Sequence, residues 1–178
     1  MPNHVKTVVK INKLEKDDID FILNTIASPF LHTPEGIPVE YAIDFNKIIP
    51  EPEDESECPD EYKVNKDSHI AVRDEKPWFD WYEWHIANWG TKWGAYDCYT
   101  KIGKSYIKFI FSTAWNVAQP IIERLSLLGF PLEVKYADED WGSNCGVVTW
   151  SHEQGWEIQF AKDMHNPERF ARDLWDRY

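Results

Sequence analysis

The chain has few cysteines. Its three, Cys58, Cys98 and Cys145, fit neither a disulfide framework nor a CxxC pair. A length of 178 residues with 43% hydrophobic side chains is enough for one sizeable core. We therefore expect one domain, spanning residues 1–178, that folds without disulfides in a reducing compartment.

Long apolar runs are also missing. The first residues, Met1 to Lys6, lack the charged region followed by an apolar stretch that marks a signal peptide. No run of apolar residues approaches the roughly 18 that a membrane-spanning helix needs. We expect a cytoplasmic protein with no membrane partner.

Positive charge is in the minority, with 19 Lys and Arg against 31 Asp and Glu and a net charge of −12. Such a chain repels nucleic acid at long range and favours a basic protein as its partner. The acidic residues concentrate in a segment at about residues 50–62, which we predict to be an exposed, mobile loop. Its candidate partner-binding residues are Glu51, Glu53, Asp54, Glu55, Glu57, Asp60 and Glu61. The alternative is a solvated loop without a function.

Motifs that carry catalysis or bind metals are absent. The six histidines form no HExxH, HxH or Cys/His cluster, and no GxGxxG or GxxxxGK[ST] occurs. The carboxylates at 138–140 lack calcium-loop spacing and favour a turn. Cys145 with His152 suggests a nucleophile and its base, but no third residue orients them, so we favour entry into a hairpin. We expect no enzymatic activity, no metal and no cofactor.

The hydrophobic pattern predicts an alternation of strands and helices. We expect strands at 4–11, 41–49, 95–102, 105–113 and 132–136, a hairpin at 145–150 and 156–160, and helices from Asp17, from Pro77 to Asn88, from Pro120 and after Asn166. Residues 30–40 are predicted to be a loop, and Pro29 to end the first helix. Two split βαβ units predict a ferredoxin-like α+β fold: an antiparallel sheet with helices on one face, an extra β-hairpin and a C-terminal helix.

Aromatic residues are abundant, and the string from Asn88 to Trp93, Asn-Trp-Gly-Thr-Lys-Trp, is the most distinctive feature. One interpretation is an exposed platform in which Trp89, Lys92 and Trp93 grip a partner or stack a base. The other is a tight turn after a helix that docks both tryptophans into the core, with Gly90 as the helix stop. We favour the turn and keep the three side chains as candidate binding residues.

This string, the Ala95-Tyr96-Asp97 that follows it and the run from Phe111 to Trp115 resemble the YubB-type ferredoxin-like family of bacteriophage and conjugative-plasmid proteins. The resemblance covers roughly residues 77–160 and, more weakly, the first strand and helix. The chain departs from the pattern after Trp115, where the family often has adjacent prolines and this chain has only Pro120. The resemblance implies a ferredoxin-like fold and a mobile genetic element, and it brings no established activity.

Charge and resemblance together suggest an acidic phage protein that acts in the bacterial host cytoplasm. It would inhibit a host nucleic-acid-handling defence protein, in the manner of an anti-CRISPR or anti-restriction protein, by occupying a basic groove. An alternative is a single-stranded nucleic-acid-binding module that uses Tyr96, Tyr99, Lys101, Lys104, Tyr106 and Lys108. A phage structural or assembly protein is a further alternative, and so is an enzyme using Cys145 or the carboxylates at 138–140.

Overall fold

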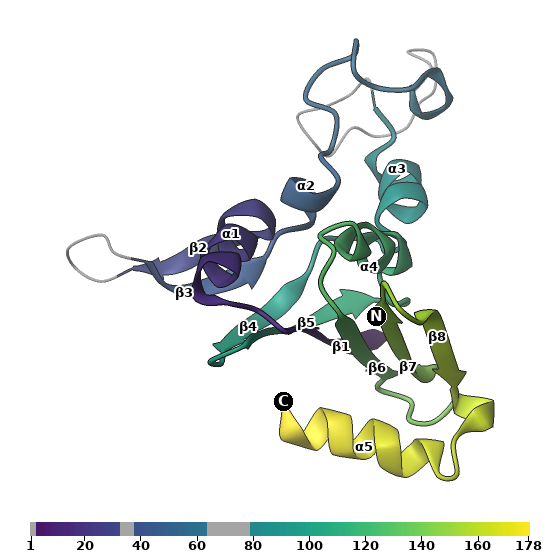
Figure 1. Cartoon of the computed structure of the whole chain (residues 1–178). Helices are drawn as coiled ribbons and strands as arrows, with labels where there is room; N and C mark the ends of the chain where they lie inside the picture. Colours follow the sequence, from purple (N-terminus) through teal and green to yellow (C-terminus); the bar gives the residue numbers. More distant parts are fainter. Residues whose placement is uncertain (1–2, 33–37, 64–78) are drawn as a thin grey trace.

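The computed structural model describes residues 3–32, 38–63 and 79–178 and shows a mixed α+β protein (Figure 1). Its largest element is a six-stranded antiparallel sheet in the order β4-β5-β1-β6-β7-β8. The strands are β1 (His4–Asn12), β4 (Tyr96–Ile102), β5 (Tyr106–Ala114), β6 (Leu132–Asp138), β7 (Cys145–Ser151) and β8 (Gly155–Phe160). The antiparallel sheet expected from the sequence is confirmed.

β1 lies in the middle of the sheet, and its side chains alternate between the two faces. Val5, Val9 and Ile11 are fully buried on one face. Lys6, Val8 and Lys10 point to the other face, as the period of two in a strand requires. The first face therefore packs into a large hydrophobic core, and the second face contributes Val8 to a smaller apolar cluster.

Two helices cover the first face, α1 (Lys16–Ile26) and α4 (Gln119–Ser126). Asp18 closes a capping box with Glu15 at the start of α1, where acidic side chains also suit the helix dipole. Pro120 lies in the first turn of α4, and Gly129 follows its end with a φ of +84°. Their buried side chains are Ile19, Ile22, Leu23 and Ile26 in α1 and Ile121, Ile122 and Leu125 in α4.

The C-terminal helix, α5 (Pro167–Arg177), lies along the second face of the sheet (Figure 1). Asn166 caps it, as predicted, by accepting a hydrogen bond from the Arg169 N–H at 2.9 Å. Ala171 and Leu174 pack against the cluster around Val8. The helices therefore do not all lie on one face as the sequence suggested: α5 makes a third layer.

The segment between α1 and β4 holds a small two-stranded sheet, β2 (Ala27–His32) and β3 (Pro38–Ile43), followed by α2 (Phe45–Ile48), a 3-10 turn (Asp60–Tyr62) and α3 (Trp81–Asn88). Several predictions are corrected here. Pro29 does not end the first helix, which stops at Ile26, but lies inside β2, and the strand expected at 41–49 ends at Ile43 because Asp44 caps α2. Pro77, predicted to open the second helix, lies outside the described residues, but the helix begins only at Trp81, since Phe79 pairs with Lys63 and Asp80 caps α3. The middle of the loop predicted at 30–40 also lies outside the described residues, and its two ends belong to β2 and β3 instead.

None of the helices in the described ranges is long and apolar enough to cross a membrane.

Candidate functional site

Trp89, the first tryptophan of the Asn88–Trp93 motif, belongs to the core. It is 5% exposed, and its ring stacks on His85 with centroids 4.0 Å apart. Its indole N–H donates to the Ile49 carbonyl at 2.9 Å, which ties α3 to the chain that follows α2. The exposed-platform interpretation is therefore wrong for Trp89, because a buried ring that already has its hydrogen-bond partner is inaccessible to another protein.

Gly90 and Thr91 form the turn that the sequence predicted after the helix. Gly90 has a φ of +78°, and its N–H donates to the carbonyls of His85 and Ile86, as at a helix C-terminus. Thr91 is fully buried, and its hydroxyl donates to the Ala114 carbonyl at 2.9 Å. The motif thus fixes the end of α3 to the end of β5.

Trp93 is exposed and Lys92 is half-buried, and both belong to an aromatic cluster with Tyr82 and Trp115. The Lys92 ammonium lies 4.7 Å from the ring centroid of Trp93, 5.4 Å from Trp115 and 5.9 Å from Tyr82. Trp93 is 40% exposed, and Trp115 is 38% exposed with a left-handed φ of 68°. The favoured turn interpretation, which placed both tryptophans in the core, is therefore confirmed for Trp89 and wrong for Trp93. Of the three candidate residues in the motif, Trp93 and the partly exposed Lys92 remain available to a partner.

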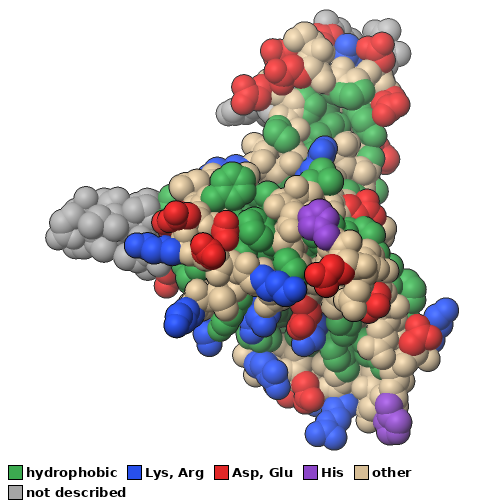
Figure 2. All heavy atoms as spheres, viewed as in Figure 1, with side chains coloured by type: hydrophobic (Ala, Val, Ile, Leu, Met, Phe, Trp, Pro, Cys, Tyr) green, Lys and Arg blue, Asp and Glu red, His purple; other side chains and the backbone are tan. Residues whose placement is uncertain are grey.

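The acidic segment lies with α3 in a lobe that projects from the sheet (Figures 1 and 2). Six of its seven carboxylates are exposed: Glu53, Asp54, Glu55, Glu57, Asp60 and Glu61. Glu51 is the exception, since it is only partly exposed and its carboxylate lies 3.5 Å from His85 Nε2. Glu51 therefore faces the interior of the lobe rather than a partner.

The conformation of the acidic segment is held by its own side chains. Asp54 accepts hydrogen bonds from the Ser56 hydroxyl and N–H, which lower the pKa of its carboxyl. The Glu57 carboxylate accepts from the Glu53 N–H at 3.1 Å, and Cys58 is 3% exposed and packs in the main core. The segment thus presents its charges from a defined turn that Cys58 anchors.

The carboxylates at 138–140 connect strand ends. Glu139 accepts from the His4 N–H at 3.0 Å, and Asp140 accepts from the Asn3 side chain. Asp138 is 6% exposed. Within the part of the chain that the structure describes, no group of three or more His, Cys, Asp or Glu is placed to hold a metal ion. The turn interpretation therefore accounts for these residues.

Asp138 makes a pH-dependent contribution to the free energy of unfolding. Burial, then the charges of Asp140 and Glu139, raise the pKa of its carboxyl above the ordinary 3.8. The folded protein therefore binds this proton more tightly than the unfolded chain does. The resulting stabilisation of the fold is fully present below the ordinary pKa of 3.8 and is lost as pH rises through the raised pKa. We expect the free energy of unfolding of the wild type, relative to Asp138→Asn, to fall between about pH 4 and about pH 7 in urea titrations. A difference that is the same at both pH values would contradict this assignment.

Cys145 and His152 do not form a catalytic pair. They lie at and just beyond opposite ends of β7, whose bounds are Cys145–Ser151. Cys145 is 2% exposed, and burial raises the pKa of its thiol, which disfavours the nucleophilic thiolate. His152 is exposed and packs edge-on against Trp150. The nucleophile interpretation is therefore wrong.

A further charged surface lies on the second face of the sheet, beside α5. Its cations are Lys10, Lys101, Lys108, Lys135 and Arg177, which we name the basic face. The register also places Tyr96 and Tyr99 on this side, since Ser112 and Ile110, their partners, lie there. The sequence pointed to Lys101 and Lys108 but missed Lys10, Lys135 and Arg177, because only strand pairing and the position of α5 bring them together.

No family model matches the chain, and no curated protein or solved structure matches it either. The resemblance to the YubB-type family therefore stays a prediction that depends on the motif residues. The features of the molecule that bear on its function are the two charged surfaces and the aromatic cluster.

Proposed function

We propose that the protein is a non-enzymatic binding protein that docks its acidic segment into a basic groove of a nucleic-acid-handling partner. The observation that carries this proposal is the exposure of six carboxylates between Glu53 and Glu61. Closely spaced negative charges on an exposed segment resemble a phosphate backbone and steer association with a basic surface. Trp93 and Lys92 add an exposed aromatic contact at the base of the same α3 region.

The order of the strands in the sheet supports the ferredoxin-like fold that the resemblance implies. Four neighbouring strands, in the order β4-β5-β1-β6, are linked through α1 and α4 on one face. We infer from this order that the domain is ferredoxin-like, with the segment from β2 to α3 inserted before β4 and the β7–β8 hairpin added at one edge. A ferredoxin-like domain of this family would come from a phage or another mobile element, where an inhibitor of a host defence protein (anti-CRISPR or anti-restriction type) has a role.

Neutralising the acidic segment is expected to abolish capture of the partner without unfolding the domain. We choose Glu53→Gln, Glu55→Gln and Glu57→Gln, because glutamine preserves the acceptor that Glu57 offers to the Glu53 N–H. The measurement is a pull-down from bacterial lysate treated with nuclease, over a salt series, with identification by mass spectrometry. Wild type should capture a basic nucleic-acid-handling protein and lose it as salt rises.

A matched variant controls for net charge. Asp20→Asn, Glu153→Gln and Glu157→Gln remove the same three charges from exposed positions on α1, the β7–β8 turn and β8. This variant should capture the partner as well as wild type does. Equal capture by all three proteins would remove the acidic segment from the mechanism.

A phage structural or assembly role makes a different prediction. A structural protein is abundant in purified virions, whereas an inhibitor acts in the host and is absent from them. Quantitative mass spectrometry of virions separates the two classes.

A further inference from the structure

Three lysines stand side by side across the sheet. Strand pairing places Lys101 of β4 directly opposite Lys108 of β5, and Lys108 directly opposite Lys10 of β1. Directly opposed side chains in antiparallel strands have Cβ atoms about 5 Å apart. The three lysine side chains therefore leave the sheet in a transverse row, on the side that carries α5.

This row is only partly neutralised by its neighbours: the charges of Lys10 and Lys108 help to lower the pKa of the Glu133 carboxyl, after the larger effect of its hydrogen bond to Lys135. Like charges directly opposite one another destabilise a sheet. Glu133 lies opposite Lys10, but its carboxylate pairs with Lys135 at 2.8 Å. Asp173, on the neighbouring helix, lies 3.8 Å from Arg169. The arrangement costs stability, and an anionic ligand would relieve that cost.

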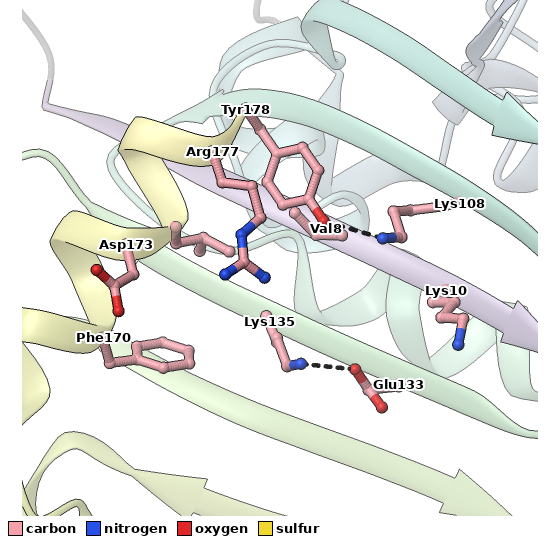
Figure 3. A pocket seen from close by; sticks show the side chains of 10 residues that line it. Val8, Lys10, Lys108, Glu133, Lys135, Phe170, Asp173, Arg177 and Tyr178 are labelled. Carbon is pink, nitrogen blue, oxygen red and sulfur yellow. Dashed lines mark hydrogen bonds and ion pairs between the residues drawn. The ribbon is translucent and has the colours of Figure 1, made fainter.

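The helix α5 lies beside the lysine row and forms one side of a groove. Figure 3 shows Lys10, Lys108 and Lys135 on the sheet facing Arg177 and Tyr178 at the end of the helix, around a groove of about 390 Å³. Lys108 donates to the Tyr178 hydroxyl at 2.9 Å. Burial raises the pKa of Tyr178, but the Lys108 hydrogen bond and the charges of Lys108, Arg177 and Lys135 outweigh it and lower the pKa. The groove is thus a region of positive potential.

Two tyrosines flank the cations, Tyr99, which is exposed, and Tyr106, which is half-buried. Tyr99 is 53% exposed and lies two residues from Lys101 on the same side of β4. Tyr106 lies two residues from Lys108, and the Lys10 ammonium is 4.9 Å from its ring centroid. Cations that follow a backbone, with aromatic rings that stack bases, are the two elements of single-strand binding surfaces.

We propose that the basic face binds single-stranded nucleic acid across the strands, with phosphates on the lysine row and bases on Tyr99 and Tyr106. This site is separate from the acidic segment. The acidic lobe and α5 lie at opposite ends of the molecule (Figure 1). Charges separated by more than the Debye length of about 8 Å are largely screened at physiological salt. The net charge of −12 therefore does not prevent binding at this face.

The test measures fluorescence anisotropy of labelled twelve-residue oligothymidine and oligouridine with the full chain. Lys10→Gln with Lys108→Gln should weaken binding at least tenfold at low salt. It should also lower the slope of log affinity against log salt by about 1.4, since each contact to a single strand contributes roughly 0.7. The melting temperature should stay unchanged or rise, because the substitutions remove opposed like charges. Loss of binding would then not reflect unfolding.

Two further variants complete the design. Lys16→Gln with Arg124→Gln removes the same charge from exposed positions on α1 and α4, on the other side of the sheet, and should bind like wild type. Tyr99→Ser should weaken binding roughly fivefold or more through lost stacking.

Several outcomes would overturn the proposal. One is an unchanged anisotropy up to about 100 µM wild-type protein, the weak end of non-specific binding. Equal losses in the two charge variants would show general electrostatics rather than a site. Duplex DNA or inorganic polyphosphate that binds as tightly, with no effect of Tyr99→Ser, would assign the face to phosphate recognition without bases. None of these results bears on capture through the acidic segment.

Discussion

Replacing Trp89 with alanine is expected to lower the free energy of unfolding by about 3 to 5 kcal/mol, the usual cost of truncating a large buried aromatic side chain. The ring is 5% exposed and contacts Phe45, Trp84 and His85. Its removal also leaves the Ile49 carbonyl without its indole donor. The loss therefore combines a cavity with a broken hydrogen bond.

Trp93→Ala provides the matched comparison, since it makes the same substitution four residues away in the same motif. Trp93 is 40% exposed, so we expect a loss below about 1 kcal/mol. Urea denaturation followed by far-ultraviolet circular dichroism measures both variants without depending on tryptophan fluorescence. Similar losses in the two variants would contradict the division of the motif into a core residue and a surface residue.

Replacing Gly90 with alanine is expected to lower the free energy of unfolding by about 2 to 5 kcal/mol. A left-handed backbone costs a residue with a Cβ about 1 to 2 kcal/mol, and forced overlap adds about 1 to 3 kcal/mol. Gly90 has a φ of +78°, and a Cβ there would lie 2.8 Å from Pro120 Cδ and 3.4 Å from the Gln119 nitrogen. The substitution therefore pushes the turn away from the start of α4.

Gly94→Ala is the control from the same stretch of chain. A Cβ at Gly94 would meet only Trp89 Cζ3, at an ordinary contact distance of 3.9 Å, and its φ lies outside the left-handed region. We expect a change within about 1 kcal/mol of wild type. Thermal and urea unfolding of both variants test the comparison, and a Gly90→Ala protein as stable as Gly94→Ala would refute it.

The sequence predicted the regular parts of the sheet and its helices because their signals are local. Pro120 near the start of α4, Asn166 as the cap of α5 and the alternating residues of β5 and β6 each mark an element within a few positions. β2 was missed because Pro29 was interpreted as a helix stop. A proline is tolerated in a two-stranded sheet, where one side of each strand has no partner.

The candidate site was predictable only where charge is contiguous in sequence. The acidic segment can be recognised in the sequence as a run of carboxylates. The sequence did not reveal that one of them, Glu51, lies against His85 and not at the surface offered to a partner. The lysine row was not visible, because Lys10 and Lys108 are brought together by register, which the spacing of residues along one strand does not specify. The turn interpretation correctly placed Trp89 in the core, but it could not specify the hydrogen bond from its indole to the distant Ile49 carbonyl.

The central position of β1 has a consequence for the order of folding. Val9 pairs with Phe109 on one side and with Val134 on the other, so the first strand meets both neighbours only after a hundred or more residues have been made. Contacts so distant in sequence slow folding, because the intervening chain must close before they form. We expect an emerging chain to leave β1 unpaired until β5 is synthesised, so that the apolar side chains of β1 stay without their native neighbours for most of translation.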